Sequence, residues 1–381
     1  MNRMKPEKKR VFFACVVMAA LLVVVGILRM NAVNSAKKQA ERTSKTMIAE
    51  YAKKQEDLRL TVAVIRGDEM EAAVYIKDGA LVSQASSAVS AALTGEVPAG
   101  NTDGNDAGDI FTRQYEIGSL TKTFVGALFA KYASEGRLSL TDPVSSYVDF
   151  SGRYDPTILE LLTHTSAYED YRTNGFIQMA KYRLNKNPYR GISSERVPVF
   201  MRRFSTGMTA PYEYSFSNFG YAVLGNVIEA VEGRPFKEVM EEYIRTELQL
   251  PDTAFQTEPS IEKAWKWNED DAFLPAAGLS SDISDLAAYV RLYFEDRIDE
   301  GRLLAITGAK NAGGSSKAAL GWGVRPDGVV GHGGETSHYS AQILFDSQKK
   351  TAVIVLSNRT ESNQITVPEL AEQIYLEQFG E

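Results

Sequence analysis

The 381-residue chain is 44% hydrophobic, so it can bury the core of one large domain or of two smaller ones, which excludes a disordered protein. Residues 1–58 hold 12 Lys and Arg against 5 Asp and Glu, and the remainder holds 30 against 44. The net charge of about −14 beyond residue 58 argues against nucleic acid as a partner.

A basic tail, residues 1–10, precedes an apolar run from Val11 to Leu28 that contains no charged residue. A run of this length just spans a bilayer as a helix, and the basic flank favours a cytoplasmic N-terminus. We expect an uncleaved single-pass anchor in the cell membrane, with the rest of the chain extracellular. A cleaved signal peptide is the less favoured alternative, because no small-x-small site follows closely. The only cysteine, Cys15, lies in the run, which excludes disulfides and thiolate metal sites in the exported part.

Residues 29–58 are rich in Lys, Glu, Gln and Ala and are expected to form a solvated, partly helical stalk. Residues 59–381 are then the exported domain. Two strands are expected at 60–65 and 72–76. Residues 77–79 are expected to form a turn before residues 80–82. A long excursion with recurring glycine follows Val82 up to Asp109 and is expected to contain no regular element.

Apolar residues recur at three- and four-residue spacing from Thr121 until Gly136, which predicts a buried helix. Ser119 and Lys122 stand one turn apart at its start. This places a primary amine beside a hydroxyl, an arrangement that activates a serine when no histidine is adjacent. Ser-x-x-Lys alone is common by chance, and its ordinary explanation is an N-cap serine with a surface lysine.

Further elements follow along the chain. Helices are expected at 158–162, 221–231, 236–248 and 282–294, paired strands at 340–345 and 352–356, and a last helix opened by Thr366 and Pro368. Strands at both ends with helices between predict an α+β fold. Its antiparallel sheet is formed by the N- and C-terminal segments, beside a mainly helical subdomain.

Three further segments accompany Ser-x-x-Lys: residues 156–166 (PTILELLTHTS), residues 214–225 (YSFSNFGYAVLG) and residues 331–334 (GHGG). Together they resemble the serine β-lactamase and penicillin-binding protein superfamily, in particular its class C-like branch of β-lactamases, D-Ala-D-Ala carboxypeptidases and esterases. The resemblance runs from about Leu60 to the C-terminus. It implies the β-lactamase/transpeptidase-like form of the α+β fold.

The resemblance also implies roles for individual residues. Ser119 would attack an acyl carbon and Lys122 would take its proton, which requires a lysine whose pKa is lowered by burial and nearby positive potential. The oxyanion would be held by the backbone N–H groups of Ser119 and Glu335. Asn218 would hydrogen-bond the substrate. Neither a metal nor a cofactor is implied.

One position departs from the family pattern. Relatives have Tyr-x-Asn where this chain has Phe216-Ser217-Asn218. Phenylalanine carries no proton, so Lys122 acts alone or activity is weak. Tyr214 is an alternative donor, although a two-residue shift along an extended chain is about 6.5 Å. Whether Tyr214 compensates stays open.

The third motif corresponds to His-x-Gly in the esterase-like branch. His332 would add a polar or cationic edge to the pocket, and Gly333 and Gly334 would let the backbone approach the substrate. Glu335 stands where relatives have a small or neutral residue. Turned toward the cleft, its carboxylate would favour a substrate with a free ammonium, such as a D-alanyl ester; on the other strand face it would point to solvent.

The other two histidines are less informative. His164 belongs to a turn segment and is expected to be structural; relatives usually have Gly where Ala167 stands. His338 lies on the strand-entry loop, where it either lines the pocket rim or is exposed.

The leading hypothesis is a membrane-anchored, exported serine hydrolase that acts through an acyl-enzyme on D-alanyl groups of the bacterial cell envelope. The expected substrate is cell-wall peptidoglycan or a teichoic acid-type polymer, cleaved by a D-Ala-D-Ala carboxypeptidase or a D-alanyl esterase. A catalytically impaired envelope-binding or regulatory protein is the second hypothesis, supported by Phe216, and a class C-like β-lactamase is the third. Retention of both Ser119 and Lys122 favours an enzyme.

The insert from Tyr168 to Pro211 suits a lid over the cleft and equally a plain surface excursion. The acidic balance of the domain opposes a polyanionic substrate. A local basic patch would weaken that objection, and the candidates for it are Lys181, Arg183, Lys186 and Arg190.

Overall fold

The computed structural model describes residues 43–89, 109–152, 154–168, 180–181, 184, 186–204, 214–256, 261–298 and 317–380. The chain divides into two compact units, residues 1–47 and 48–381, and the fold described below is that of the second. Within the described residues no helix is long and apolar enough to cross a membrane. The anchor predicted at residues 11–28 lies outside them.

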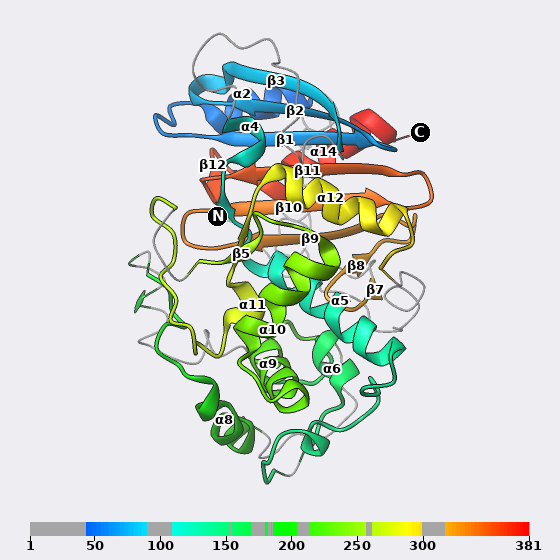
Figure 1. The fold of residues 1–381 in the computed structure, drawn as a ribbon. Coiled ribbons are helices and arrows are strands. Elements are labelled where there is room, and N and C mark those ends of the chain that lie inside the picture. The colour runs from blue at the N-terminus through cyan, green and yellow to red at the C-terminus, as the bar shows by residue number, and fades with distance from the viewer. Residues whose placement is uncertain are drawn as a thin grey trace, which may run out of the picture. The chain divides into compact units, whose positions relative to one another are not determined.

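The main sheet has eight strands in the order β3-β2-β1-β11-β10-β9-β8-β7, and every neighbouring pair is antiparallel (Figure 1). The strands are β1 Leu60–Arg66, β2 Glu69–Tyr75, β3 Leu81–Ala88, β7 Lys317–Ala318, β8 Gly323–Val324, β9 Val330–Glu335, β10 Ser340–Asp346 and β11 Thr351–Ser357. The first strand pairs along its whole length with β11, so that Leu60 lies opposite Ser357. This confirms the predicted α+β fold, in which both terminal segments share one sheet.

The central strands are covered on both faces. Every residue of β10 is buried, and β11 is buried except at Thr351. The helix α12 (Ile283–Phe294) packs against β11 and β1, and α14 (Val367–Phe379) packs against β10 and β11. Figure 1 shows α12 in front of the sheet and α14 behind it. Strands buried on both faces are expected to be almost continuously apolar, as β11 is from Ala352 to Leu356, whereas β10 also buries Ser340, Gln342 and Asp346.

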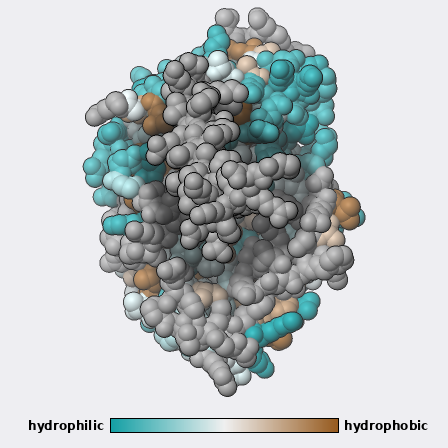
Figure 2. Space-filling view, turned by 180° about the vertical axis from the view of Figure 1, so that it is seen from behind, coloured by the Kyte–Doolittle hydropathy of each residue, from teal (hydrophilic) through white to brown (hydrophobic). Residues whose placement is uncertain are grey.

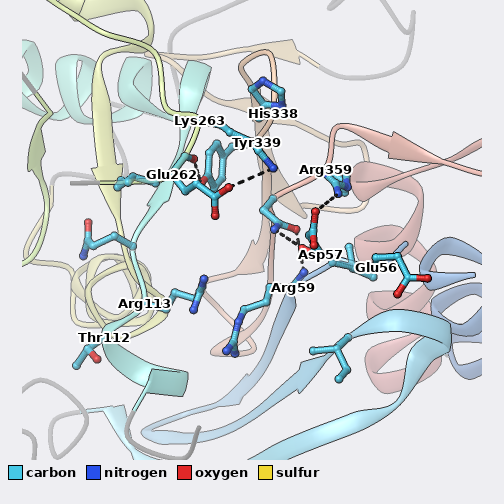
Figure 3. Close-up of a pocket in the computed structure, with 15 residues that line it drawn as sticks. Glu56, Asp57, Arg59, Thr112, Arg113, Glu262, Lys263, His338, Tyr339 and Arg359 are labelled. Atoms are coloured by element: carbon cyan, nitrogen blue, oxygen red, sulfur yellow. Dashed lines mark hydrogen bonds and ion pairs between the residues drawn. The ribbon is translucent and has the colours of Figure 1, made fainter. Parts of the chain in front are cut away.

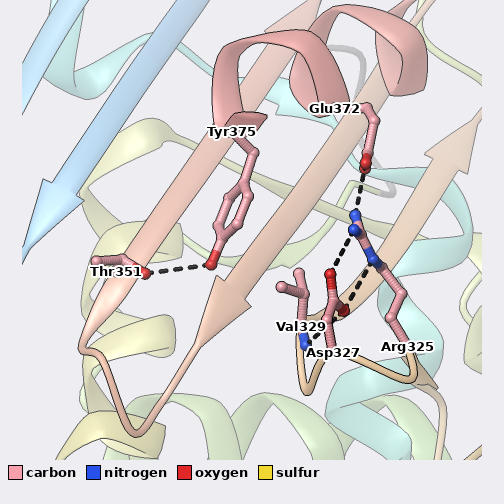
Figure 4. A network of polar contacts seen from close by, with 6 residues as sticks. All are labelled: Arg325, Asp327, Val329, Thr351, Glu372 and Tyr375. Atoms are coloured by element: carbon pink, nitrogen blue, oxygen red, sulfur yellow. Dashed lines mark hydrogen bonds and ion pairs between the residues drawn. The ribbon is translucent and has the colours of Figure 1, made fainter. Parts of the chain in front are cut away.

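Polar contacts hold α14 to the sheet (Figure 4). Arg325 binds both Asp327, at the β8–β9 turn, and Glu372 on the helix, each at 2.6 Å. The Tyr375 hydroxyl lies 3.2 Å from the Thr351 hydroxyl at the start of β11. The position of the C-terminal helix is therefore set at both its first and its second half.

The helical subdomain lies beside β9. Its helices are α5 Thr121–Ser134, α6 Ile158–Leu162, α8 Val197–Phe204, α9 Asn218–Glu232, α10 Phe236–Tyr243, which continues as a π-helical turn at Ile244–Leu248, and α11 Leu274–Ala277. A short sheet, β4 Tyr115–Glu116, β6 Leu279–Ser281 and β5 Ala254–Phe255, joins the two halves. The other described α-helices and strands are α2 Ser44–Ala52, α4 Asp109–Thr112, β12 Glu361–Ser362 and β13 Ile365–Thr366.

Two regions differ from the expectation. The excursion predicted after Val82 begins instead with a strand, since residues 83–88 continue β3 and pair with β2. Residues 83–88 are small and mostly polar, so they lack the alternating apolar pattern from which a strand is predicted. Backbone hydrogen bonds to β2 hold them at the edge of the sheet. Residues 90–108 of the excursion lie outside the described residues.

The compact unit also begins before residue 59. Tyr51 is completely buried, and its hydroxyl bonds the Ser357 hydroxyl at 3.0 Å and the Arg359 carbonyl at 2.8 Å. Residues 48–58, which the sequence assigned to the stalk, therefore pack on the domain.

On the face shown in Figure 2 the described surface is mostly hydrophilic, with apolar atoms in small separate groups.

Candidate active site

Ser119 lies in a 3-10 turn, Gly118–Leu120, that leads directly into α5. Gly118 has a φ of +48°, and a Cβ at this position would lie only 2.6 Å from the Glu335 backbone nitrogen. Only glycine adopts such a backbone in so little space. The turn is therefore pressed against β9, with the serine at the N-terminal end of a buried helix.

Lys122 is completely buried one turn after the serine. Its Nζ lies 3.0 Å from Ser119 Oγ, 2.7 Å from Asn218 Oδ1 and 2.7 Å from the carbonyl oxygen of Ala276. An ammonium donates three hydrogen bonds, whereas a neutral amine donates two and keeps a lone pair. In the neutral form Asn218 and Ala276 take both N–H groups, and the lone pair faces the Ser119 hydroxyl.

Aromatic rings cover the other sides of the amine. Lys122 Nζ lies 4.8 Å from the centre of the Phe216 ring and 5.3 Å from that of Tyr221. Phe216 is 38% exposed and lines the cavity at Ser119. Tyr214, by contrast, packs edge-on against His164 at 5.6 Å, and burial raises its pKa to about 12. It is Phe216, without a hydroxyl, that stands beside the lysine.

His164 holds the segment before α9 in place. Its Nδ1 accepts a hydrogen bond from the Ser217 backbone at 3.1 Å, and its carbonyl accepts one from Ser215 at 2.8 Å. Burial, and secondarily the positive charge of Lys122, hold the His164 pKa well below its usual value, so the ring is neutral. The residue is structural, as predicted. His164 and Ala167 both have positive φ, 58° and 53°, a conformation that favours glycine.

Asn218 is the first residue of α9, whose start is capped by the Ser217 hydroxyl accepting from the Gly220 N–H. While its Oδ1 accepts from Lys122, its Nδ2 donates to the Tyr189 hydroxyl at 3.0 Å. Tyr189 is 2% exposed and stacks on Phe273 at 4.4 Å. The sequence analysis missed Tyr189, because it belongs to no motif and stands in the insert of uncertain shape.

Strand β9 forms the opposite wall. A Cβ on Gly334 would lie 1.8 Å from the Ile117 carbonyl oxygen and 2.8 Å from the Ser119 nitrogen, so the strand backbone touches the Gly118–Leu120 turn. Alternation along a strand places His332 and Gly334 on this face and Glu335 on the other. Glu335 is exposed and lines the same cavity as Ser119. The Glu335 and Ser119 backbone nitrogens both lie at this junction, where the resemblance placed the oxyanion hole.

His332 is half-buried, and its Nδ1 lies 2.5 Å from the Gly333 carbonyl oxygen. Burial, and secondarily the charge of Lys122, lower the His332 pKa to about 4. The ring is neutral at physiological pH, so the edge that it adds to the pocket is polar and not cationic.

These residues surround one cavity of about 340 Å³, which we call the catalytic cavity. Its lining includes every site residue predicted from the sequence except Lys122, which lies behind Ser119: Ser119, Asn218, His332, Gly334 and Glu335, with Tyr189, Phe216 and Trp265. His338 instead lines a different cavity of about 630 Å³ (Figure 3). No cluster of three or more histidine, cysteine, aspartate or glutamate side chains that could hold a metal ion occurs in the described part of the chain.

Glu116 is a second residue that the sequence analysis missed. This buried carboxylate accepts hydrogen bonds from the Trp265 backbone at 2.8 Å and from the Thr336 hydroxyl at 2.7 Å. Burial raises its pKa to about 7. Glu116 thereby joins β4 to the β9–β10 turn and to the loop that carries Trp265.

The family model for beta-lactamase matches residues 70–373, about four-fifths of the chain. The chain belongs to the beta-lactamase family. Protein flp of Staphylococcus aureus is 26% identical over 294 residues, which are 69% of this chain and 56% of that protein. A D-aminopeptidase of Brucella anthropi is 24% identical over 64% of this chain and 49% of its own length. The chain thus spans about half the length of the curated relatives that it matches.

Solved structures share the fold. A penicillin-binding protein homologue from Pyrococcus abyssi, described as octameric, has a TM-score of 0.62 at 21% identity, covering 94% of this chain and 78% of its own. A D-stereospecific amidohydrolase from Streptomyces sp. has a TM-score of 0.62 at 18% identity, covering 88% and 99%. A beta-lactamase/D-alanine carboxypeptidase from Yersinia pestis has 0.61 at 15%, covering 87% and 96%. The superfamily expected from the motifs is confirmed.

Proposed function

We propose that this protein is a serine hydrolase that forms an acyl-enzyme on Ser119 with D-alanyl groups of the bacterial cell envelope, as a D-alanyl esterase or a D-Ala-D-Ala carboxypeptidase. The observation that carries the proposal is the 3.0 Å contact between Lys122 Nζ and Ser119 Oγ, beside the junction of the Ser119 and Glu335 backbone nitrogens. Relatives named D-aminopeptidase, D-stereospecific amidohydrolase and D-alanine carboxypeptidase support a D-configured acyl group.

The geometry supports the following steps. Neutral Lys122 takes the Ser119 proton while Oγ attacks the acyl carbon, and the oxyanion is held by the two backbone N–H groups. The C–O or C–N bond then breaks, and the leaving alcohol or amine takes the proton back from Lys122. Water hydrolyses the resulting serine ester by the same route, which releases the acid and restores the free hydroxyl.

Esters fit the site better than amides. An amine leaving group must be protonated as it departs, whereas an alcohol needs less help. The hydroxyl-free Phe216 beside Lys122 removes one group that could deliver that proton. We propose further that residues 11–28 anchor the enzyme in the cell membrane, with the catalytic domain outside.

The test is to incubate the full-length protein with a fluorescent penicillin, with p-nitrophenyl esters and with D-alanyl esters. Covalent labelling is read on gels and hydrolysis by product release. Ser119→Ala is expected to abolish labelling and to lower turnover by at least about a thousandfold, since removal of the nucleophile leaves only the remaining binding and oxyanion groups. Turnover that does not depend on Ser119 with any of these acyl donors would exclude the mechanism.

The second candidate is an envelope-binding protein that retains the pocket without efficient chemistry. Phe216 favours it, because an apolar ring stands where proton transfer is expected. It predicts saturable binding of envelope fragments by both wild type and Ser119→Ala, with no acyl-enzyme in either.

A further inference from the structure

A second cavity, of about 450 Å³, adjoins the catalytic cavity. Four cationic side chains line it, Lys181, Lys186, Arg190 and Lys266, and no carboxylate lies in its described lining. We call it the basic cavity. Three of the four, Lys186, Arg190 and Lys266, are exposed at its surface and are therefore open to a ligand from solvent.

The same two loops build both cavities. In one loop Tyr189 lines the catalytic cavity and the next residue, Arg190, lines the basic cavity. In the other, Trp265 lines both, and the next residue, Lys266, lines the basic cavity. A ligand that extends out of the catalytic cavity over Trp265 therefore meets cationic side chains next.

Hydrogen bonds fix the two loops to each other. Asn187 donates from Nδ2 to the Lys266 carbonyl at 3.0 Å and accepts at Oδ1 from the Tyr189 N–H at 2.9 Å. Behind the first loop, Asp271 accepts from the Gly191 N–H at 2.7 Å. These hydrogen bonds hold the two loop backbones together, so the backbone positions that carry the cationic side chains are fixed before a ligand binds.

The charge of this cavity opposes that of the surrounding domain. The chain beyond residue 58 carries a net charge of about −14, which repels polyanions at long range. The larger cavity shown in Figure 3 mixes Arg59 and Arg113 with Asp57 and Glu262. In the basic cavity, by contrast, the charged residues of the described lining are all cations, so this cavity favours an anion.

We propose that the basic cavity binds phosphate groups of a phosphodiester polymer whose D-alanyl ester enters the catalytic cavity. The proposal rests on the proposed function and narrows its substrate to a teichoic acid-type ester. Four cations in one cavity match a chain of repeating charges. A peptide ending in D-Ala-D-Ala carries its α-carboxylate on the residue next to the attacked carbonyl, close to Ser119 and not beyond Trp265.

Binding tests the proposal without catalysis. The probe is poly(glycerol phosphate) free of D-alanine, titrated calorimetrically into the full-length protein. Lys186→Gln/Lys266→Gln is expected to weaken its binding about tenfold and to flatten the salt dependence. The matched control, Lys317→Gln/Lys349→Gln, removes the same charge from two exposed positions, one in β7 and one in the β10–β11 turn, and is expected to bind as the wild type does. An equal effect of both double variants, or no effect of the first, overturns the proposal.

A competition arm distinguishes the polymer from free anion. Inorganic phosphate, at the same concentration of phosphate groups and constant ionic strength, is expected to displace little polymer. If it competes on equal terms, the cavity takes a single anion, and the polymer assignment is wrong.

Turnover supplies the last arm. The ratio of kcat/KM for the D-alanylated polymer to kcat/KM for the D-alanyl ester of a small neutral alcohol is expected to fall about tenfold in Lys186→Gln/Lys266→Gln and to stay at the wild-type value in the control. An equal fall with a D-Ala-D-Ala peptide replaces the phosphate assignment with a carboxylate one. If no acyl donor shows Ser119-dependent turnover, the proposed function fails, and the calorimetric result alone decides whether the cavity binds the polymer.

Discussion

At the scale of single residues, the position of Lys122 Nζ is set by the groups that form hydrogen bonds with it. Asn218 and the Ala276 carbonyl each lie 2.7 Å away, and Ser119 Oγ lies at 3.0 Å. Asn218 is held in turn by the Tyr189 hydroxyl. The Asn218 amide therefore orients the lysine toward Ser119, and the Tyr189 hydroxyl in turn orients the amide.

The neighbouring ring leads to a prediction for Phe216→Tyr. The ring centre is 4.8 Å from Lys122 Nζ, and the side chain is 38% exposed, so a hydroxyl has room at the cavity. We expect kcat for amide or β-lactam substrates to rise about tenfold, because a positioned proton donor contributes about 10²–10⁴ in rate. Esters should gain less. Steady-state kinetics on both substrate classes measure the effect.

The control for this variant is Tyr214→Phe. Tyr214 packs on His164 and is absent from the described lining of the catalytic cavity, so its hydroxyl should not affect turnover. Unchanged amide hydrolysis in Phe216→Tyr would show that the missing phenol does not limit the reaction.

At the scale of elements, the proposed activity depends on how closely β9 approaches the turn before α5. Gly334 permits that approach, since a Cβ there would lie 1.8 Å from the Ile117 carbonyl oxygen. The contact joins the main sheet to the helical subdomain. The two backbone N–H groups proposed to form the oxyanion hole, those of Ser119 and Glu335, come from opposite sides of this contact.

Gly334→Ala should therefore separate β9 from the Gly118–Leu120 turn. We expect turnover to fall at least about a hundredfold, since one oxyanion donor is worth about 10²–10³ in rate, and the free energy of unfolding to drop by about 2 kcal/mol. Kinetics and urea denaturation measure the two effects.

Gly333→Ala is the matched comparison on the other face of the strand. The nearest atom to its Cβ would be Gln342 Oε1, at 2.5 Å, on a flexible side chain, and the nearest backbone atom would be the Ala341 carbonyl oxygen, at an ordinary contact distance of 3.5 Å. A loss of less than about tenfold in turnover is expected. Equal losses in the two variants would mean that the close approach at Gly334 is not what matters.

At the scale of the whole molecule, stability is coupled to pH through Glu116, which joins β4, the β9–β10 turn and the Trp265 loop. Burial raises its pKa from 4.5 to about 7. An acid whose pKa is higher in the folded than in the unfolded state makes its full contribution to the free energy of unfolding at a pH below the pKa of the unfolded state. That contribution is lost as the pH rises through the pKa of the folded state, because burial then opposes ionisation.

Glu116→Gln removes this ionisation and keeps both hydrogen bonds, with the amide oxygen accepting from Trp265 and the amide nitrogen donating to Thr336. We expect the variant to gain stability over the wild type by about 2 kcal/mol more at pH 8 than at pH 5, since one pKa unit corresponds to about 1.4 kcal/mol. Urea denaturation at the two pH values measures the difference. Glu262→Gln, an exposed change near the same loop, is the control; the same pH dependence in both variants would contradict the assignment to Glu116.

The sequence by itself determined what depends on local spacing. Ser119 and Lys122 are three residues apart on a helix start, so their proximity follows from helix geometry. Apolar patterning and capping residues likewise predicted the four longest described helices, α5, α9, α12 and α14, and the strands β1, β2, β10 and β11. The expectation that the N- and C-terminal segments share one antiparallel sheet followed from the same pattern.

Only the tertiary structure decided the surroundings of that pair. Asn218 and Ala276 stand 96 and 154 positions from Lys122, and no local pattern specifies a hydrogen bond across such separations. Tyr189 and Glu116 acquire their places by packing between elements that the sequence does not order in space. The basic cavity likewise joins two loops, because Asn187 bonds the Lys266 carbonyl. Chain geometry thus places Ser119 beside Lys122, and packing of distant segments shapes the cavity around them.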